Sequence, residues 1–241
     1  MFSDSHTSTL SNGLRVRFRR VMNSDQQRVQ ILIVRHAESE ANLSGVLAGR
    51  IDPTPLTRKG KNAARALKPI LELFDPQAVF VSPMLRCRQT ASLAGYQDFI
   101  IDDRLLEMDY GSWSGRKLKM LSRRKEWKSI QQSPTTFEFP KGESFRNASE
   151  RINDFINSAL DGSLTRITLF THGDIARIMI NQMMGRELND FQKIMIEPGS
   201  HSLLVADRRD WRSSMTIGYL NRLPESIATR RGPTDFQVGG E

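Results

Sequence analysis

The sequence predicts an α/β protein with a mostly parallel central sheet, and two observations carry this prediction. Short β-branched apolar runs alternate with helical segments along the chain, which is the order of β-α-β units. The chain has 241 residues, 38% of them hydrophobic and 26% charged, so it can bury a core and has the composition of a soluble globular protein.

The strands are expected where apolar runs end abruptly at polar residues. Arg28–Val34 (RVQILIV) is typical of a central strand that is buried on both faces. Three further strands are expected at Gln77–Val81, Asp98–Ile101 and Arg166–Phe170. Ser202–Ala206 and Met215–Tyr219 are joined by a charged turn and predict a hairpin at the sheet edge.

The helices are expected between these strands. Thr57 can cap a helix that runs towards Phe74, and Pro69 predicts a kink or a break inside it. Helical spacing of apolar residues also occurs in Met84–Ala94, Ser144–Leu160 and Asp174–Met184. The remaining segments are a loop over Arg104–Gly115, a basic amphipathic stretch over Arg116–Ile130 and an irregular insert over Ser133–Gly142.

One main domain is expected over residues 28–224. It should be a three-layer α/β/α sandwich with an antiparallel edge strand, and the insertion at about 110–142 should lie over the pocket as a cap. Residues 1–27 are expected to form a basic, disordered N-terminal extension. Residues 225–241 are polar and glycine-rich and are expected to be a poorly ordered tail.

Charge and composition limit the classes of ligand and partner that we expect the protein to bind. The formal net charge of +8 favours anionic ligands. The sequence lacks runs of five or six like charges and apolar runs near 18–20 residues, so we expect neither a nucleic-acid nor a membrane partner. Cys87 is the one cysteine, which excludes an internal disulfide and a cysteine-rich zinc site and favours a cytoplasmic location. The oligomeric state stays open, a dimer included.

Two histidines follow directly after predicted buried strands. His36 follows ILIVR and His172 follows ITLFT. Ligands of open α/β sheets bind beyond the carboxyl ends of the strands, so we expect both rings in one pocket. Arg35 and Arg86 also follow strand ends, and guanidinium groups bind phosphate oxygens in pairs. The four side chains together predict a phosphate site.

Further groups of this site are expected from neighbouring segments. Asn42 and the backbone N–H groups at the start of the helix after His172, beginning with Gly173, can add hydrogen-bond donors. Glu107 lies in the loop after the third predicted strand, and a carboxylic acid beside a phosphate site is suited to protonate a leaving oxygen.

Six blocks of the sequence resemble the motifs of the histidine phosphatase superfamily, the phosphoglycerate-mutase-like proteins, and occur in the order of that family. They are Arg35–Asn42 (RHAESEAN), Gly49–Thr57 (GRIDPTPLT), Ser82–Thr90 (SPMLRCRQT), Leu106–Gly111 (LEMDYG), Phe139–Ser144 (FPKGES) and Thr171–Asp174 (THGD). Cys87 stands where the family usually has alanine. The fifth block is similar to the phosphatase branch.

The resemblance implies a role for each matching residue. His36 would be the nucleophile and form a phosphohistidine, and Glu107 would protonate the leaving group and then act as base for water. Arg35, Arg86 and His172 would bind the transferring phosphoryl group, with Asn42 helping. The two arginines and a protonated His172 would supply the positive charge that Mg²⁺ supplies elsewhere, so we expect no metal and no cofactor.

The expected activity is hydrolysis of a small phosphorylated substrate by a metal-independent phosphatase. A phosphoglycerate mutase is the alternative, and a phospho-ligand binding module without catalysis is a third hypothesis. Mutases of the family typically carry arginine after the catalytic glutamate, where this sequence has Met108. The cationic surroundings should keep His36 neutral and Glu107 ionised, so Glu107 would need burial or substrate charge to raise its pKa.

Overall fold

The computed structural model describes residues 27–224. The expectations of a disordered extension before residue 27 and a poorly ordered tail from residue 225 lie outside the described residues.

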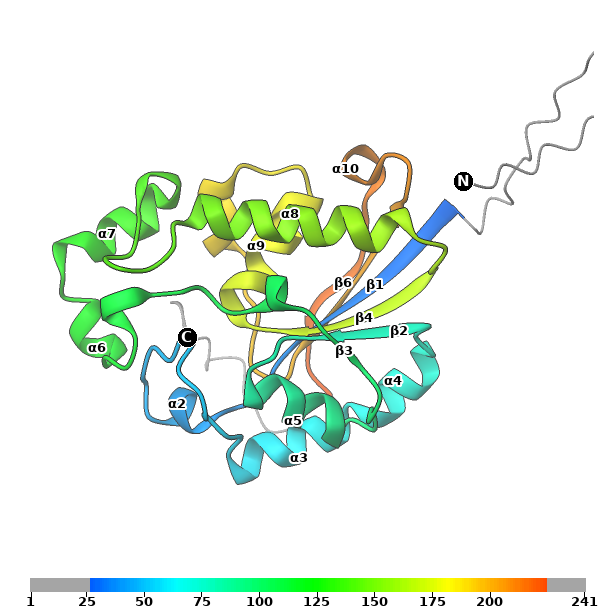
Figure 1. Ribbon diagram of the computed structural model, residues 1–241, viewed down its shortest axis with the longest axis horizontal. Helices are drawn as coiled ribbons and strands as arrows, with labels where there is room; N and C mark the ends of the chain where they lie inside the picture. Colours follow the sequence, from blue (N-terminus) through cyan, green and yellow to red (C-terminus); the bar gives the residue numbers. More distant parts are fainter. Residues whose placement is uncertain (1–26, 225–241) are drawn as a thin grey trace, which may run out of the picture.

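A six-stranded sheet with the order β3-β2-β4-β1-β5-β6 lies at the centre of the described chain (Figure 1). Its strands are β1 (Arg28–Arg35), β2 (Ala78–Val81), β3 (Ile100–Ile101), β4 (Arg166–Thr171), β5 (His201–Asp207) and β6 (Thr216–Arg222). Parallel pairing joins β1 to β4, β4 to β2 and β2 to β3. β5 is antiparallel to both β1 and β6. The mostly parallel sheet and the edge hairpin are confirmed, and the reversed strand is β5, one position inside the edge strand β6.

Helices cover both faces of the sheet (Figure 1). On one face lie α8 (Phe145–Asp161) and α9 (Gly173–Met183), and on the other lie α3 (Arg58–Ala66), α4 (Lys68–Phe74) and α5 (Leu85–Leu93). The shorter helices are α2 (Glu40–Leu43), α6 (Leu118–Leu121), α7 (Lys125–Gln132) and α10 (Trp211–Ser214). Single 3-10 turns occur at η1 (Asp103–Leu105), η2 (Gly111–Trp113) and η3 (Pro134–Thr136), with a longer one at η4 (Leu188–Lys193). This is the expected three-layer α/β/α arrangement.

The central strand β1 shows why both faces are covered. Val29, Ile31 and Ile33 pack into the core on the α8–α9 face, whereas Leu32 and Val34 pack into the core on the α4–α5 face. Alternate side chains of a strand point to opposite faces, so a continuous apolar run requires a layer of helices on each side.

The break at Pro69 is confirmed. The Oγ1 of Thr57 accepts a hydrogen bond from the N–H of Gly60 at 2.9 Å and caps α3 as expected. α3 ends at Ala66, and α4 begins at Lys68 with Pro69 in its first turn, where the missing N–H of proline costs nothing.

The insertion packs beside the segment that follows α2. The N–H of Leu118 donates to the carbonyl of Gly45 at 2.9 Å, and that of Gly115 donates to the carbonyl of Leu47 at 2.8 Å. Behind these contacts an aromatic cluster joins the insertion to α8 through rings 5.0–5.7 Å apart; its members are Tyr110, Trp113, Phe137, Phe139 and Phe145. The insertion is therefore anchored to the main domain.

Candidate active site

The candidate site lies at the carboxyl ends of three adjacent strands. His36 follows β1, His172 follows β4 and Ser82 follows β2, and these strands are neighbours in the sheet. The ring centroids of His36 and His172 are 5.2 Å apart. The structure therefore brings together the two histidines that the sequence places after separate strands.

Hydrogen bonding selects one tautomer of His36. Its Nδ1 lies 2.8 Å from the carbonyl oxygen of Ala37, which can only accept, so Nδ1 carries the proton. Burial, followed by the charges of Arg86 and Arg35, lowers the pKa of His36 well below its usual value. The ring is therefore neutral at pH 7, and its Nε2 carries a lone pair.

Two buried guanidinium groups surround this lone pair. The Nε of Arg86 donates to Nε2 of His36 at 3.3 Å, and its Nη2 donates to the carbonyl of Gly49 at 2.7 Å. The Nη1 of Arg35 donates to the carbonyl of Ile196 at 2.6 Å. Burial, with Arg177 next, lowers the pKa of Arg35 to about 10, so it stays charged at neutral pH.

One N–H group on each arginine has no protein acceptor. Arg35 Nε and Arg86 Nη1 are buried and make no hydrogen bond to any described residue. An unpaired buried donor is costly, so two of them near one cavity indicate a ligand that accepts hydrogen bonds. An anion such as a phosphoryl group has the required oxygens and charge.

His172 does not supply the positive charge expected from the sequence. It is fully buried, and burial followed by the charges of Arg86, His36 and Arg35 lowers its pKa well below the usual value. Its Nε2 lies 2.8 Å from the Oγ of Ser82. Burial and the neighbouring charges therefore disfavour the protonated His172 that the sequence led us to expect.

At Glu107, burial is the one of the two expected causes that raises the pKa. Burial, followed by the carboxylate of Asp174, raises its pKa to about 7, against the opposing effects of the Met108 N–H, Arg86 and Arg35. The cations alone would hold Glu107 ionised, as expected, but burial outweighs them. Glu107 therefore exists in both its protonated and its ionised form near neutral pH.

Asn42 and Gly173 are the last two of the site residues expected from the sequence. The Oδ1 of Asn42 accepts hydrogen bonds from the N–H and the Oγ of Ser39, which closes a capping box on α2 and orients the amide at the cavity. Gly173 is the first residue of α9, and a Cβ there would lie 3.1 Å from the Cζ of Arg35. The missing side chain lets the guanidinium lie against the helix start.

These groups enclose a small cavity of about 40 Å³. Its lining includes Arg35, His36, Asn42, Arg86 and Glu107. Tyr110 and Leu118, from the insertion, complete one wall. His172 and Gly173 do not line it, but the ring of His172 lies against His36 and Gly173 lies against the guanidinium of Arg35.

Sequence reasoning missed three side chains that hold the site. Ser82 contacts His172, and the Oγ1 of Thr90 accepts a hydrogen bond from the N–H of Ala37 at 3.1 Å. Asp174 accepts hydrogen bonds from Tyr110 at 2.8 Å and from Arg177 at 3.1 Å. All three lie within the six motif blocks, and this position was the signal in the sequence that could have identified them. Their hydrogen-bond partners come from distant segments and could not be identified in this way.

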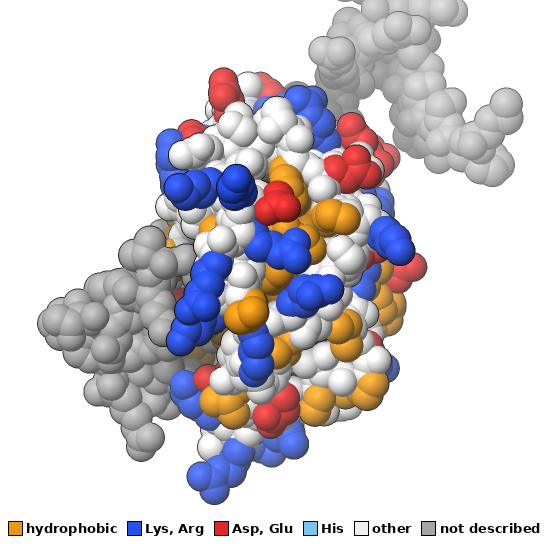
Figure 2. All heavy atoms as spheres, turned by 90° about the vertical axis from the view of Figure 1, so that its left-hand side faces the viewer, with side chains coloured by type: hydrophobic (Ala, Val, Ile, Leu, Met, Phe, Trp, Pro, Cys, Tyr) orange, Lys and Arg blue, Asp and Glu red, His pale blue; other side chains and the backbone are white. Residues whose placement is uncertain are grey.

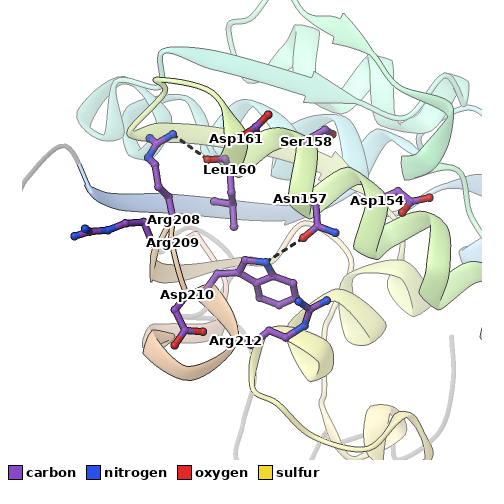
Figure 3. A pocket seen from close by; sticks show the side chains of 10 residues that line it. Asp154, Asn157, Ser158, Leu160, Asp161, Arg208, Arg209, Asp210 and Arg212 are labelled. Atoms are coloured by element: carbon purple, nitrogen blue, oxygen red, sulfur yellow. Dashed lines mark hydrogen bonds between the residues drawn. The ribbon is translucent and has the colours of Figure 1, made fainter. Parts of the chain in front are cut away.

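Another polar cavity, of about 740 Å³, lies between α8 and the turn from β5 to α10 (Figure 3). The indole Nε1 of Trp211 donates to Asn157, and Arg208 donates to the carbonyl of Leu160. These bonds are within the wall of the cavity, and none of the candidate site residues lines it.

Lysine and arginine side chains gather on the face formed by the insertion (Figure 2). They include Arg116, Lys117, Lys119, Arg123, Arg124, Lys125 and Lys128, all exposed. None of these seven forms an ion pair with another described residue. The basic stretch predicted from the sequence is therefore an unneutralised surface beside the cavity.

Among residues 27–224, no helix is long and apolar enough to cross a membrane.

Comparison with known proteins identifies the family. The sequence model of the histidine phosphatase superfamily (branch 1) matches residues 31–216. The chain belongs to this superfamily. The six motif blocks lie on this matched region, and so do all the candidate site residues.

Relatives that are named for different activities resemble this chain. It is 27% identical over 187 residues to phosphoserine phosphatase 1 of Hydrogenobacter thermophilus, covering 75% of this chain and 88% of the relative. It is also 27% identical over 194 residues to a probable phosphoglycerate mutase, GpmB, of Cronobacter sakazakii, covering 77% and 89%. The structure of a putative α-ribazole-5′-P phosphatase from Escherichia coli has the same fold, with a TM-score of 0.71 and 23% identity over 80% of this chain and 96% of that one.

Proposed function

We propose that this protein is a metal-independent phosphomonoester hydrolase that works through a phosphohistidine on His36. One observation carries the proposal: Nε2 of a neutral, buried histidine presents its lone pair beside Arg86, with the proton held on Nδ1 by Ala37. A neutral imidazole nitrogen is a competent nucleophile near pH 7, and its position at the strand ends gives it access to the cavity.

The phosphoryl group would be held by donors that lack acceptors in the protein. Arg35 Nε and Arg86 Nη1 would each bind a phosphoryl oxygen, and the two cations would offset its negative charge. His172, Asn42 and the N–H of Gly173 at the start of α9 would bind the remaining oxygens. In this arrangement two fixed guanidinium groups take the part that a metal ion takes in other phosphoryl-transfer sites.

The two half-reactions would use Glu107 in both of its protonation states. In the first, His36 Nε2 forms a bond to phosphorus, the bond to the ester oxygen breaks, and protonated Glu107 gives its proton to that oxygen. In the second, the Glu107 carboxylate takes a proton from water, water attacks phosphorus, and the N–P bond breaks to release phosphate. A pKa of about 7 suits a group that must act as acid and then as base.

A mutase is the alternative activity, because one relative is named as a probable phosphoglycerate mutase. Met108, which stands in place of the arginine expected in mutases, is fully buried in the hydrophobic core. That position therefore offers no charge to a second anionic group of the substrate, and this supports the phosphatase. The substrate would be a small phosphorylated molecule of the cytoplasm.

The test is release of phosphate from p-nitrophenyl phosphate in excess EDTA, for wild type and His36→Ala together. Turnover by wild type that is lost in the variant is the expected result. Phosphate binding should survive the substitution, because Arg35 and Arg86 remain. A silent wild type that transfers phosphate between the hydroxyls of phosphoglycerates would favour the mutase instead. Turnover that survives His36→Ala would overturn the assignment of the nucleophile.

A further inference from the structure

The carboxylate of Glu143, in the fifth motif block, connects three segments that are distant in the sequence. Its side chain is 13% exposed. Its Oε2 pairs with Arg50 at 3.2 Å, and its Oε1 pairs with Arg151 at 2.8 Å. The same Oε1 accepts a hydrogen bond from the N–H of Asp109 at 3.0 Å. All three contacts lead to the loop that carries Glu107.

Both arginines bind the backbone of the candidate acid. The Nε of Arg50 donates to the carbonyl of Glu107 at 3.0 Å, and the Nη2 of Arg151 donates to the same oxygen at 3.4 Å. The Nη1 of Arg151 also donates to the carbonyl of Arg104 at 2.6 Å. A guanidinium group is a rigid planar fork, so its pairing with Glu143 fixes the direction of its other donors. Glu143 thus holds two donors on one carbonyl of the loop.

Glu143 binds the same loop through its own backbone as well. Its N–H donates to the carbonyl of Asp109 at 2.9 Å, while its carboxylate accepts from the N–H of Asp109. A Cβ at Gly142 would overlap the carbonyl oxygen of Asp109, so the two backbones approach this closely only because Gly142 has no side chain. The position two residues after Glu107 is therefore fixed by the same residue.

The direction of the Glu107 carboxyl depends on this backbone. Among the described residues, the hydrogen bond that its side chain makes is local: Oε1 accepts from the N–H of Met108 at 3.0 Å. No side chain within residues 27–224 binds the Glu107 carboxyl, which lines the cavity. A shift of the loop would therefore move the carboxyl with it.

We propose that Glu143 is a positioning residue: it holds Arg50 and Arg151 on the backbone of Glu107 and so fixes where the Glu107 carboxyl meets the leaving group. The inference rests on the proposed function, in which Glu107 is the general acid. Glu143 does not line the cavity, and the residues that would bind the phosphoryl group, Arg35 and Arg86 among them, make no printed contact with it. Its loss should therefore impair proton donation and spare phosphoryl binding.

The leaving group separates these two effects experimentally. An alkyl phosphate such as glycerol 2-phosphate leaves as a basic alkoxide unless it is protonated, whereas p-nitrophenolate leaves readily without a proton. The ratio kcat/KM reports the first half-reaction, in which Glu107 acts as acid. We would measure it for wild type and Glu143→Gln on both substrates at pH 6, below the Glu107 pKa of about 7. The amide keeps an acceptor for the N–H of Asp109 but removes the charge that pairs with the two arginines.

The loss should be confined to the alkyl substrate. For Glu143→Gln we expect kcat/KM on glycerol 2-phosphate to fall by about 10- to 100-fold, because a displacement of about 1 Å costs a catalytic group a factor of that order. On p-nitrophenyl phosphate it should stay within about threefold of wild type. The inhibition constant of inorganic phosphate should change by less than about twofold, because the phosphoryl-binding groups are untouched.

A double-variant cycle shows whether Glu143 acts through Glu107. Glu143→Gln added to Glu107→Gln should lower kcat/KM on glycerol 2-phosphate by less than about twofold, because the group that it positions is already gone. A role in general stability would instead make the two effects multiply.

Arg50→Lys tests the same connection from the other side. A lysine has one ammonium group and cannot bind the carboxylate of Glu143 and the carbonyl of Glu107 in the geometry of a guanidinium. We expect the same dependence on the leaving group with a smaller loss of about fivefold, because Arg151 remains. This variant decides the question if Glu143→Gln fails to fold, as judged by thermal melting.

Asp190→Asn is the matched control. Asp190 also pairs with two cations, Arg186 and Lys193, but it lies on η4 and does not line the cavity. Its variant should act as wild type on both substrates.

An equal loss on both substrates, or effects that multiply in the cycle, would overturn the proposal in favour of a structural role. A wild-type rate of Glu143→Gln on glycerol 2-phosphate would overturn it directly, as would a wild-type Arg50→Lys if Glu143→Gln does not fold. Failure of the proposed function gives a different result: Glu107→Gln would then hydrolyse glycerol 2-phosphate as fast as wild type. A slow Glu107→Gln beside an unimpaired Glu143→Gln would reject the role of Glu143 alone.

Discussion

The Nε of Arg86 donates a hydrogen bond at 3.3 Å to Nε2 of His36, the unprotonated nitrogen of the ring. Arg86 reaches this position from the first turn of α5, and its other nitrogens contact Gly49 or lack an acceptor. Arg86 thus adds to the effect of burial in lowering the His36 pKa, and it presents an unused donor to a phosphoryl oxygen.

Arg86→Lys should lower kcat/KM for p-nitrophenyl phosphate by about 10²- to 10³-fold. A lysine keeps the charge but cannot contact His36, Gly49 and a phosphoryl oxygen at once, since it lacks the planar fork. Steady-state kinetics of the two proteins measure this. Arg88→Lys, an exposed arginine two residues further along α5, is the control and should act as wild type. Near-normal activity of Arg86→Lys would mean that charge alone suffices.

The pH profile should report Glu107 but not His36. Because the Glu107 pKa is raised to about 7, the acid form persists to neutral pH and is lost above it. The kcat/KM for an alkyl phosphate, corrected for ionisation of the substrate, should therefore descend above about pH 7. Because the His36 pKa is lowered well below its usual value, no ascending limb should appear near the ordinary histidine value.

Glu107→Gln should abolish the descending limb and slow the alkyl substrate by about 10²- to 10⁴-fold, since proton transfer by a positioned acid contributes rates of that order. A descending limb that persists in this variant would assign it to another group.

Phe139→Ala should destabilise the protein by about 3–5 kcal/mol, the usual cost of removing a buried phenyl ring. The ring is 3% exposed and packs between Tyr110 and Phe145, so it anchors the insertion to α8. Urea unfolding monitored by tryptophan fluorescence measures the change. Leu73→Ala, at a side chain that is 88% exposed, should change stability by less than about 0.5 kcal/mol.

The basic face of the insertion should speed the encounter with anionic substrates. We expect kcat/KM to fall as salt is added, and a triple variant with glutamine at Arg123, Lys125 and Lys128 to lose about two- to fivefold at low salt with a flatter salt dependence. A triple variant with glutamine at Lys61, Arg65 and Lys68 removes the same charge from α3 and α4. Equal effects of the two variants would show that only net charge matters.

Cys87 should resist thiol reagents in the folded protein. Its side chain is fully buried, and burial raises its pKa to about 12, so about a thousandfold less thiolate forms at neutral pH than at the ordinary value of 9. Ellman's reagent should therefore titrate one thiol per chain in denaturant and react very slowly without it. Rapid native reaction with loss of activity would instead reveal an accessible thiol beside His172.

Local sequence patterns were sufficient to predict the layered α/β architecture. The run RVQILIV predicted a strand buried on both faces, Thr57 and Pro69 predicted a capped helix and its break, and His36 and His172 were placed after separate strands. These features depend on neighbouring residues and on the rule that parallel strands end at one edge of a sheet. The order β3-β2-β4-β1-β5-β6, with β5 as the reversed strand, was not predicted, because it depends on pairings between distant segments.

The sequence by itself therefore determined the fold class and the residue types gathered at the site. Only the tertiary structure decided their chemical state. Burial lowers the pKa of His172 and raises that of Glu107, and the charge of Asp174, 67 positions further along the chain, raises the Glu107 pKa as well. A pKa reflects the loss of solvent and the sum of nearby charges, and both are known only once distant segments have packed together.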